Sequence, residues 1–193
     1  MWPLARAEAA ALTAIRLIDD TRRLIRAPEV LFEAGEIGLA AFGYNIENRH
    51  LVHALDARAA ALPDLRRIDA AATAVEPAAD RTAIRLDDDS TLTARLVIGA
   101  DGRKSLCRAA AGIATDRHEY PQTALTLNFA HTRPHEGIST EFHTESGPFT
   151  LVPLPGNRSS LVCVVTPAEA EHIAALRDDA LNDEIEQIGR AHV

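Results

Sequence analysis

Residues 96–108 read LVIGADGRKSLCR, and this stretch decides how the chain is interpreted. Its apolar start, 96–100, is typical of a buried strand, which we expect to belong to a parallel sheet. Gly102 permits a tight turn after Asp101, and Ser105 is suitably placed to cap a short helix over 105–111. The segment therefore predicts a strand, a turn and a helix, with Asp101 at the carboxyl end of the strand, where ligands collect in α/β sheets.

The turn also carries positive charge beside the start of the predicted helix. Arg103, Lys104 and Arg108 surround it, and helix N-terminal N–H groups with nearby guanidinium groups favour a phosphate or pyrophosphate. A plain strand-to-helix turn, with Ser105 only as a cap, is equally compatible with these residues because Asp-Gly turns are common.

The rest of the chain is predicted to be mostly extended. Alternating or short apolar stretches predict strands, and these lie at 12–18, 29–33, 68–75, 82–86, 92–100, 124–129, 139–143, 149–154 and 160–165, with 24–26 as a hairpin partner of the first. A helix is expected over 49–61, capped by Asn48 and burying Leu51, Val52, Leu55 and Ala59. A second is expected from Pro167 to about Ile188, with Leu176 on its apolar face. The pattern indicates an α+β fold with a mostly antiparallel sheet.

The bulk composition excludes several classes of protein. The formal net charge of −8 argues against general nucleic-acid binding. Two cysteines, Cys107 and Cys163, are far apart and fit a reducing compartment better than a disulfide scaffold. We see no apolar run of membrane-span length and no signal peptide, so the expected location is cytoplasmic.

At this point the sequence resembles a known family. The pattern Gly99-Ala100-Asp101-Gly102-x-x-Ser105-x-x-Arg108 is similar to the Asp-Gly motif of the FAD-dependent aromatic hydroxylases, the class A flavoprotein monooxygenases. In that family the motif lies near the FAD pyrophosphate and is associated with NAD(P)H binding. The resemblance implies that Asp101, Gly102, Ser105 and Arg108 bind the cofactor.

Two further segments extend the resemblance over essentially the whole chain. Residues 42–49, FGYNIENR, resemble the family's entry to the helix before the Asp-Gly strand, which implies that Arg49 lies near the flavin ribityl and phosphate chain. Residues 134–137 and 147–155 resemble the substrate-domain sheet of the ubiquinone-biosynthesis hydroxylases, in particular the 2-polyprenyl-6-methoxyphenol hydroxylase type. Those relatives hydroxylate polyprenyl phenols.

Two expected features of the family are missing from the sequence. None of the ten glycines makes the Gly-x-Gly-x-x-Gly pattern, and no Gly-Asp dipeptide occurs. We therefore expect residues 1–193 to be a central fragment of a larger enzyme, inactive alone, with little or no bound FAD. Residues 40–62 and 92–112 are expected to be a remnant of the FAD domain, and residues 1–39, 66–90 and 113–193 mostly substrate-domain sheet and helix.

The implied reaction is hydroxylation of an aromatic, lipid-tailed phenol with FAD, NAD(P)H and O₂. Because the cofactor carries out the chemistry, the reaction requires no side chain as a nucleophile. The substrate is expected beside Phe142, Leu151 and Leu154. Expected partners also include the inner-membrane periphery or a biosynthetic complex, and self-association through faces exposed by truncation. Two other functions stay open: a flavin-fold reductase or halogenase that does not hydroxylate, and a non-catalytic module that binds a hydrophobic ligand or partner.

Other reactive patterns were weak. His131 and His135 are four residues apart, but Pro134 argues against a helix that presents both, and His50 and His53 lack further ligands. Neither a metal site nor a catalytic side chain is predicted. Ser159 and Ser160 form no recognisable triad, and the His135-Glu136 pair is interpreted as a loop contact.

Overall fold

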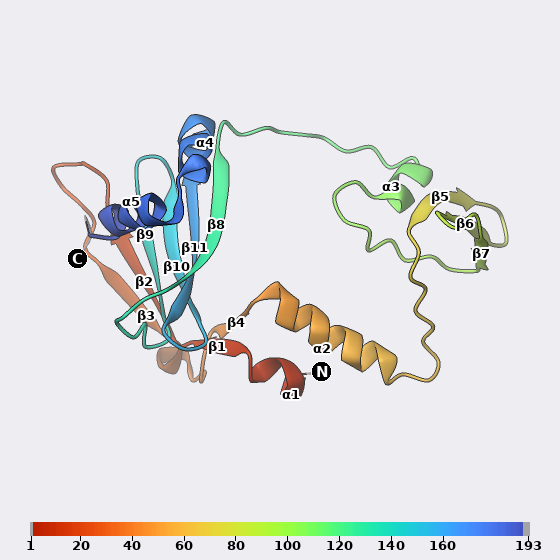
Figure 1. The fold of residues 1–193 in the computed structure, drawn as a ribbon, viewed down its shortest axis with the longest axis horizontal. Helices are drawn as coiled ribbons and strands as arrows, with labels where there is room; N and C mark the ends of the chain where they lie inside the picture. The colour runs from red at the N-terminus through yellow and green to blue at the C-terminus, as the bar shows by residue number, and fades with distance from the viewer. Residues whose placement is uncertain (1, 191–193) are drawn as a thin grey trace. The chain divides into compact units, whose positions relative to one another are not determined.

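The computed structural model describes residues 2–190, with side chains described through residue 186, and the chain forms two compact units (Figure 1). The larger unit contains the residues up to Ala61 and from Tyr120 onward, and the smaller unit contains Leu62–Glu119.

A six-stranded sheet forms the body of the larger unit, in the order β3-β2-β9-β10-β11-β8. Every neighbouring pair is antiparallel except β2 and β9, which are parallel. The predicted α+β fold with a mostly antiparallel sheet is therefore confirmed. The strands are β2 (Ala14–Asp19), β3 (Val30–Glu33), β8 (Thr123–Ala130), β9 (Ile138–His143), β10 (Pro148–Leu154) and β11 (Arg158–Val165).

Tight turns that contain glycine join the central strands. Gly147 has φ 146°, and a Cβ at this position would lie 2.9 Å from both the Cβ and the carbonyl oxygen of Val164. Only glycine allows the chain to pass so close to β11. Gly156, with φ 74°, closes the turn between β10 and β11.

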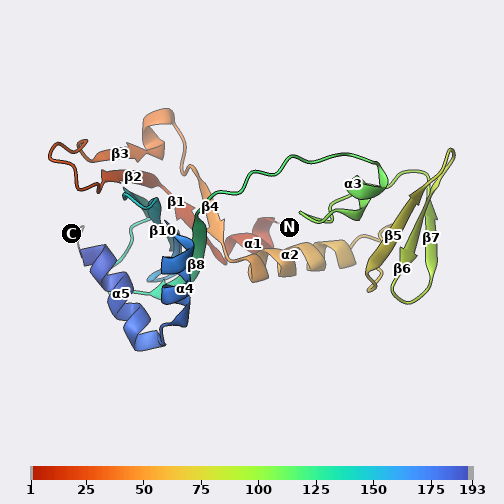
Figure 2. The same cartoon turned by 90° about the horizontal axis from the view of Figure 1, so that it is seen from above.

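Two helices, α4 (Pro167–Ala175) and α5 (Asp178–Arg190), lie on one face of this sheet (Figure 2). A capping box starts α4: Thr166 accepts a hydrogen bond from the Glu169 N–H, and the Glu169 carboxylate accepts one from the Thr166 N–H. Beneath the helices lies the core, in which Ile185 of α5 packs on a cluster formed by Phe142, Phe149, Leu161 and Cys163.

A short two-stranded sheet leads from the start of the chain toward this body. Its strands pair antiparallel, and the Asn45 side-chain amide donates a 3.0 Å hydrogen bond to the Pro153 carbonyl of β10. Trp2 and Tyr44 pack edge to face with ring centroids 4.9 Å apart. The elements are α1 (Trp2–Arg6), β1 (Ala9–Leu12), the 3₁₀ helix η1 (Ala34–Ile37), β4 (Gly43–Ile46) and α2 (Asn48–Ala60).

The smaller unit is a three-stranded antiparallel meander with one short helix. Its strands are β5 (Ala72–Pro77), β6 (Thr82–Leu86) and β7 (Thr91–Ala94), and its helix is α3 (Leu106–Ala110). Helix α3 packs on β5. Residues 66–90 are thus grouped by packing with 92–112 and not with the six-stranded sheet.

The predicted parallel strand at 96–100 is wrong. Strand β7 ends at Ala94, and no strand among the described residues pairs with 96–100. Leu96 and Ile98 are 75% and 82% exposed. An apolar run becomes a buried strand only when neighbouring strands satisfy its backbone groups, and none of the described strands does so here.

Helix predictions needed smaller corrections. Helix α2 begins at Asn48 with Glu47 as its cap residue, so Asn48 is not the cap, and Ala54 is its buried residue. On the predicted inward face, Val52 and Leu55 are 44% and 45% exposed, whereas Leu51 and Ala59 are half-buried. The described residues of the larger unit therefore cover only part of that face. The predicted helix 167–188 is two helices, because the chain leaves helical geometry at Leu176.

The hairpin partner of β2 was also misassigned. Residues 24–26 form no strand, and β2 pairs instead with β3, through registers such as Leu17 with Val30. Leu24 and Ile25 lie in an exposed loop between the two strands. A short apolar pair flanked by arginines lacks the alternation that a paired strand requires.

We expect Leu161→Ala to lower the free energy of unfolding by about 2–5 kcal/mol, because it leaves a cavity in the core. Leu161 is 1% exposed, whereas Leu24 is fully exposed at 101%. Leu24→Ala is the same chemical change and should stay within about 0.5 kcal/mol of the unmodified chain. Denaturant unfolding measures both, and equal effects would contradict the assigned core.

Candidate functional site

The Asp101 turn of the smaller unit brings together the four residues predicted there. The Asp101 carboxylate accepts hydrogen bonds from Ser105 Oγ at 2.6 Å, from the Leu106 N–H at 2.7 Å and from the Cys107 N–H at 3.2 Å. Ser105 Oγ in turn accepts a 3.0 Å bond from the Arg108 N–H. The predicted cap at Ser105 is confirmed, and Asp101 completes it.

These bonds stabilise the ionised form of Asp101. The Ser105 hydroxyl, followed by the Cys107 N–H, lowers the pKa of the Asp101 carboxyl from 3.8 to about 2. The carboxylate therefore occupies the amide donors that the sequence suggested for a phosphate. The Arg108 guanidinium donates to the Arg103 carbonyl at 2.6 Å, which fixes the turn from its other side.

Two glycines shape this turn in different ways. Gly102 has φ 75°, and a Cβ built there would meet no atom within 4 Å, so an external group can approach the chain closely. Gly99, which the sequence did not single out as a site residue, packs against the helix, because a Cβ there would lie 2.6 Å from the Cys107 Cβ. An FAD pyrophosphate can therefore be met by the Gly102 backbone and the basic Arg103 and Lys104, and these residues fit the group.

A second polar cluster, which the sequence did not predict, lies where α2 meets the large sheet. Glu47 accepts hydrogen bonds from both terminal nitrogens of Arg158, at 3.0 and 3.1 Å, and from the Asn128 amide at 3.0 Å. Arg49 Nη2 donates to the same carboxylate at 2.9 Å. Glu47 thus joins the start of α2 to β8 and β11.

The cluster keeps Glu47 ionised. Hydrogen bonds from Arg158, followed by those from Arg49, lower the pKa of the Glu47 carboxyl from 4.5 to about 2 against the opposing effect of desolvation. A charged residue at a strand-to-helix junction, in Ile46-Glu47-Asn48, is the only sequence signal that could have indicated this role. Its partner Arg158 is 111 residues away.

Arg49 lies in the larger unit, on the first turn of α2, where its side chain is 67% exposed. Besides Glu47, it contacts the His50 ring at 3.2 Å. The guanidinium is therefore held at the end of the sheet by one carboxylate and keeps further donors for an anionic group. Asp101, Gly102, Ser105 and Arg108 belong to the smaller unit.

The six-stranded sheet has two different faces. Side chains alternate along each strand, and the face beneath α4 and α5 carries the aromatic and aliphatic core. The opposite face, called the open face below, mixes small polar and branched apolar side chains that are half-buried or exposed: Thr126, Asn128, Thr150, Val152, Ser160 and Val162. The Glu47 cluster borders one end of this face, since Asn128 and Arg158 belong to it.

A His–Glu pair lies on the same face along β9. His143 Nε2 is 3.1 Å from Glu141 Oε1, and their side chains are 56% and 34% exposed. An imidazole beside a carboxylate can donate a hydrogen bond to a phenolic oxygen or accept one from it. The sequence did not indicate this pair.

Phe142, Leu151 and Leu154, the predicted substrate contacts, are core residues instead. Phe142 is 5% exposed and stacks edge to face with Phe149 at 6.0 Å, and Leu151 packs against the same cluster. Leu154 is 1% exposed. Their apolar character reflects packing beneath the helices and at the end of the sheet, so this prediction is wrong.

The histidines near β8 hold the chain together locally. His131 Nε2 lies 3.0 Å from Ser159 Oγ, and Ser159 is 4% exposed. His135 accepts the Gly137 N–H at Nδ1 and donates from Nε2 to the Leu154 carbonyl at 2.8 Å. These bonds tie the β8–β9 connection to the β10–β11 turn, which agrees with a loop contact. The described residues contain no group of three or more potential metal ligands.

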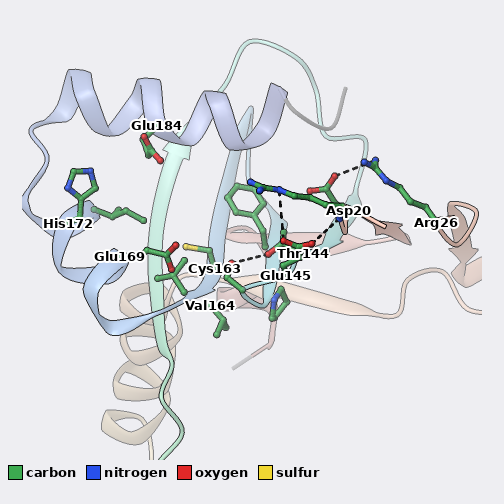
Figure 3. A pocket seen from close by; sticks show the side chains of 15 residues that line it. Asp20, Arg26, Thr144, Glu145, Cys163, Val164, Glu169, His172 and Glu184 are labelled. Atoms are coloured by element: carbon green, nitrogen blue, oxygen red, sulfur yellow. Dashed lines mark hydrogen bonds and ion pairs between the residues drawn. The ribbon is translucent and has the colours of Figure 1, made fainter. Parts of the chain in front are cut away.

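A cavity of about 600 Å³ lies between the covered face of the sheet and the helices α4 and α5 (Figure 3). Its carboxylates are largely paired within the chain: Asp20 with Arg26 at 4.0 Å, Glu145 with Arg22 at 3.9 Å, and Glu169 within its capping box. Burial raises the pKa of the Cys163 thiol in its wall. A cavity rimmed by self-paired charges is poorly suited to an apolar ligand.

A comparison with protein families identifies the chain. The model of the "FAD binding domain" family matches residues 42–193, which is most of the sequence. The chain belongs to the FAD binding domain family. The resemblance to flavin-dependent hydroxylases, stated above from the Asp-Gly segment, is therefore confirmed at the level of the family, and FAD is the family's cofactor.

Curated relatives of this FAD binding domain chain include two ubiquinone enzymes. It is 38% identical over 163 residues to ubiquinone hydroxylase UbiL of Rhodospirillum rubrum, covering 84% of the chain and 37% of that relative. It is 31% identical over 158 residues to 3-demethoxyubiquinol 3-hydroxylase of Escherichia coli, covering 81% of the chain and 40% of the relative. The chain thus spans about two fifths of the length of these curated relatives.

Solved structures show the same fold for this FAD binding domain chain. PqsL of Pseudomonas aeruginosa, described as a probable FAD-dependent monooxygenase, superposes with a TM-score of 0.72 at 21% identity, over 95% of this chain and 50% of PqsL. HpxO of Klebsiella pneumoniae, solved with FAD and uric acid, gives a TM-score of 0.65 at 18% identity, over 85% and 42% of the two chains.

Asp101→Asn should weaken the start of α3, because the substitution removes the charged acceptor of the Leu106 and Cys107 N–H groups. The pKa of the Asp101 carboxyl is about 2 in the folded state, below its ordinary value of 3.8. The ionised carboxylate therefore stabilises the smaller unit above the unfolded-state pKa, and that contribution is lost as the pH falls through the folded-state pKa. The variant should show faster hydrogen exchange at Leu106 and Cys107 at neutral pH and a smaller loss of stability on acidification. Asp116→Asn, on an exposed stretch of the same unit, is the control; unchanged exchange in Asp101→Asn would refute the cap.

A double-mutant cycle tests the Glu47 cluster. Glu47→Gln, Arg158→Gln and their combination should reveal a favourable coupling in thermal or denaturant unfolding, because Arg158 makes two parallel bonds and is only 37% exposed. The matched cycle with Arg49→Gln should give a smaller coupling, since Arg49 is 67% exposed. A coupling to Arg49 as large as that to Arg158 would show that Arg158 does not anchor the helix.

Proposed function

We propose that the chain is the substrate-binding part, and a portion of the flavin-binding part, of an FAD-dependent monooxygenase that hydroxylates the ring of a polyprenyl phenol in ubiquinone biosynthesis. The reductant would be NAD(P)H and the oxidant O₂. The observation that carries the proposal is the similarity to ubiquinone hydroxylase UbiL, at 38% identity over 163 residues. When bound, reduced FAD activates O₂ and supplies the oxygen atom that enters the ring.

The open face of the six-stranded sheet is the proposed substrate surface. Asn128, Thr150 and Ser160 offer hydrogen-bonding groups to ring oxygens, while Val152 and Val162 offer apolar contact. Glu47 supports this placement, because it fixes Arg49, the proposed flavin contact, to the same face through Arg158 and Asn128. A few fixed polar groups within apolar surroundings are the usual composition of a small-molecule site.

The cofactor contacts follow from the motif residues. Asp101, Gly102, Ser105 and Arg108 would lie near the pyrophosphate, with Asp101 and Ser105 holding the turn and the Gly102 backbone approaching the phosphates. Residues 40–62 and 92–112 would belong to the FAD domain and residues 1–39 and 113–193 to the substrate domain. The packing of α3 on β5 favours placing 66–90 with the FAD domain as well.

The proposed location is the cytoplasmic periphery of the inner membrane, where a lipid-tailed phenol resides. Among the described residues, no helix has both the length and the hydropathy needed to cross a bilayer. Exposed apolar residues such as Ile37 and Ile113 provide surfaces for self-association or for contact with a biosynthetic complex.

A segment exchange tests the function. We expect this chain, substituted for the matching 163 residues of ubiquinone hydroxylase UbiL, to convert a polyprenyl phenol into a product one oxygen atom heavier, detected by mass spectrometry with FAD, NAD(P)H and O₂. The 193-residue chain alone, given the same reagents, should bind little FAD and form no product. NAD(P)H oxidation with reduction of the substrate and no added oxygen would instead identify a reductase.

The same exchanged enzyme tests the open face. Val162→Glu should raise KM for the phenol strongly, because a carboxylate would replace an apolar contact. Leu31→Glu, on the opposite face of the edge strand β3 where Leu31 is 41% exposed, is the matched control and should leave KM unchanged. Hydroxylation with an unaltered KM in Val162→Glu would retain the function but remove the open face as the site.

A further inference from the structure

The loop between β2 and β3 projects from the sheet on a fixed neck. Asp19 Oδ1 accepts bonds from the Thr21 N–H at 3.1 Å and the Thr21 hydroxyl at 2.7 Å, and Asp19 Oδ2 accepts from the Ala27 N–H at 2.8 Å. The Ala27 N–H, followed by the Thr21 hydroxyl, lowers the pKa of the Asp19 carboxyl to about 2. Both ends of the loop are therefore fastened to one ionised side chain, and residues 22–26 form its tip.

Two large aliphatic side chains at that tip are exposed to solvent. Leu24 is 101% exposed and its neighbour Ile25 is 85% exposed. Single exposed aliphatic side chains are ordinary in proteins. Two adjacent ones at the tip of a loop with fixed ends form a small apolar surface that is accessible to a binding partner. The helices α4 and α5 contribute nothing to covering them.

Arginines flank the apolar pair. Arg22 and Arg23 precede it and Arg26 follows, on a chain whose net charge is −8. The carboxylates near them are Asp20, 4.0 Å from Arg26, and Glu145, 3.9 Å from Arg22. Asp19, at the neck of the loop, also interacts with the charge of Arg23. Such long, solvent-exposed pairs contribute little, and the Arg22 side chain remains 91% exposed. Arg22 and Arg26 line the cavity described above, but these weak pairs leave their guanidinium groups able to bind an anionic surface as well.

An apolar track leads from the loop onto the open face. Val30 of β3 pairs with Leu17 of β2, and Phe32 pairs with Ile15. Val30 and Phe32 are 40% and 45% exposed, and Leu17 and Ile15 are half-buried. These four side chains share the open face, since Leu17 lies opposite Glu141 in the parallel β2–β9 pair.

We propose that the β2–β3 loop docks the protein on an anionic lipid bilayer, with Leu24 and Ile25 inserted at the level of the acyl chains and the three arginines at the phosphate headgroups. Long arginine side chains reach the headgroup level while their neighbours enter the apolar layer. A pair of aliphatics with a few basic residues gives reversible, peripheral binding. The track from Val30 to Phe32 would receive the tail of a lipid leaving the bilayer.

This proposal names the element responsible for the peripheral location proposed above and rests on it, but it can fail without affecting the proposed reaction. Vesicle binding needs neither flavin nor substrate, whereas hydroxylation by the exchanged enzyme needs no membrane when a short-tailed phenol is used. The two experiments therefore have separate outcomes.

The test is vesicle cosedimentation of the full 193-residue chain. We expect binding to vesicles of phosphatidylcholine mixed with phosphatidylglycerol, weakened by salt, and little binding to phosphatidylcholine alone. Leu24→Ser with Ile25→Ser should lower the affinity on the order of a hundredfold, about tenfold for each side chain. Arg22→Gln with Arg23→Gln should lower the affinity about twenty-five-fold, since each basic residue near an anionic surface contributes about fivefold.

Matched controls come from the smaller unit. Leu96→Ser with Ile98→Ser removes two aliphatics that are 75% and 82% exposed, and Arg66→Gln with Arg67→Gln removes two adjacent exposed arginines. Both controls should bind vesicles like the unmodified chain. The proposal would be overturned if the controls lost as much affinity as the loop variants, or if binding did not depend on anionic lipid. It would also be overturned if the loop variants dissociated a dimer in light scattering without changing vesicle binding. Circular dichroism confirms that every variant is folded.

Discussion

The bidentate contact between Glu47 and Arg158 is the interaction on which the arrangement of the larger unit depends. It joins residues 111 apart in sequence and fixes the point where α2 leaves the sheet. Asn128 and Arg49 bind the same carboxylate, so one ionised group sets the positions of an amide on β8 and a guanidinium on α2. Without Glu47, Arg158 and Arg49 would both lose the carboxylate that they share.

The alternation of its strands gives the sheet one packed face and one open face, and the open face is the one that we propose for the substrate. On one face, Phe142, Phe149 and Leu161 lie beneath the helices and account for the stability of the unit. On the other, Asn128, Thr150 and Ser160 lie among branched apolar side chains and remain available. Phe142 and Leu151, which the sequence suggested as substrate contacts, lie on the covered face, because an apolar residue in a strand looks the same in sequence whichever face it occupies.

The Asp101 turn has a structural role that is complete within the chain, beside the cofactor role that we propose for it. The Asp101 carboxylate accepts hydrogen bonds from the first two N–H groups of α3, and Ser105 Oγ accepts one from the third. The N–H groups at the start of the helix are therefore already hydrogen-bonded within the chain. What stays accessible is the Gly102 backbone and the basic side chains around it. The motif is therefore best understood as a pre-formed turn that presents bare backbone, more than as a helix end waiting for an anion.

The sequence by itself determined the local features: the strands β8 to β11, the cap of α3 at Ser105 and the family. Each depends on residues close together in the chain, so alternation, turn chemistry and a motif were sufficient. Only the tertiary structure decided which strand pairs with β2, that residues 96–100 form no strand, which residues form the Glu47 cluster, and which side chains lie on each face of the sheet. These features depend on contacts between segments that are distant in sequence. The residues next to an apolar or charged side chain do not indicate which distant group it will contact.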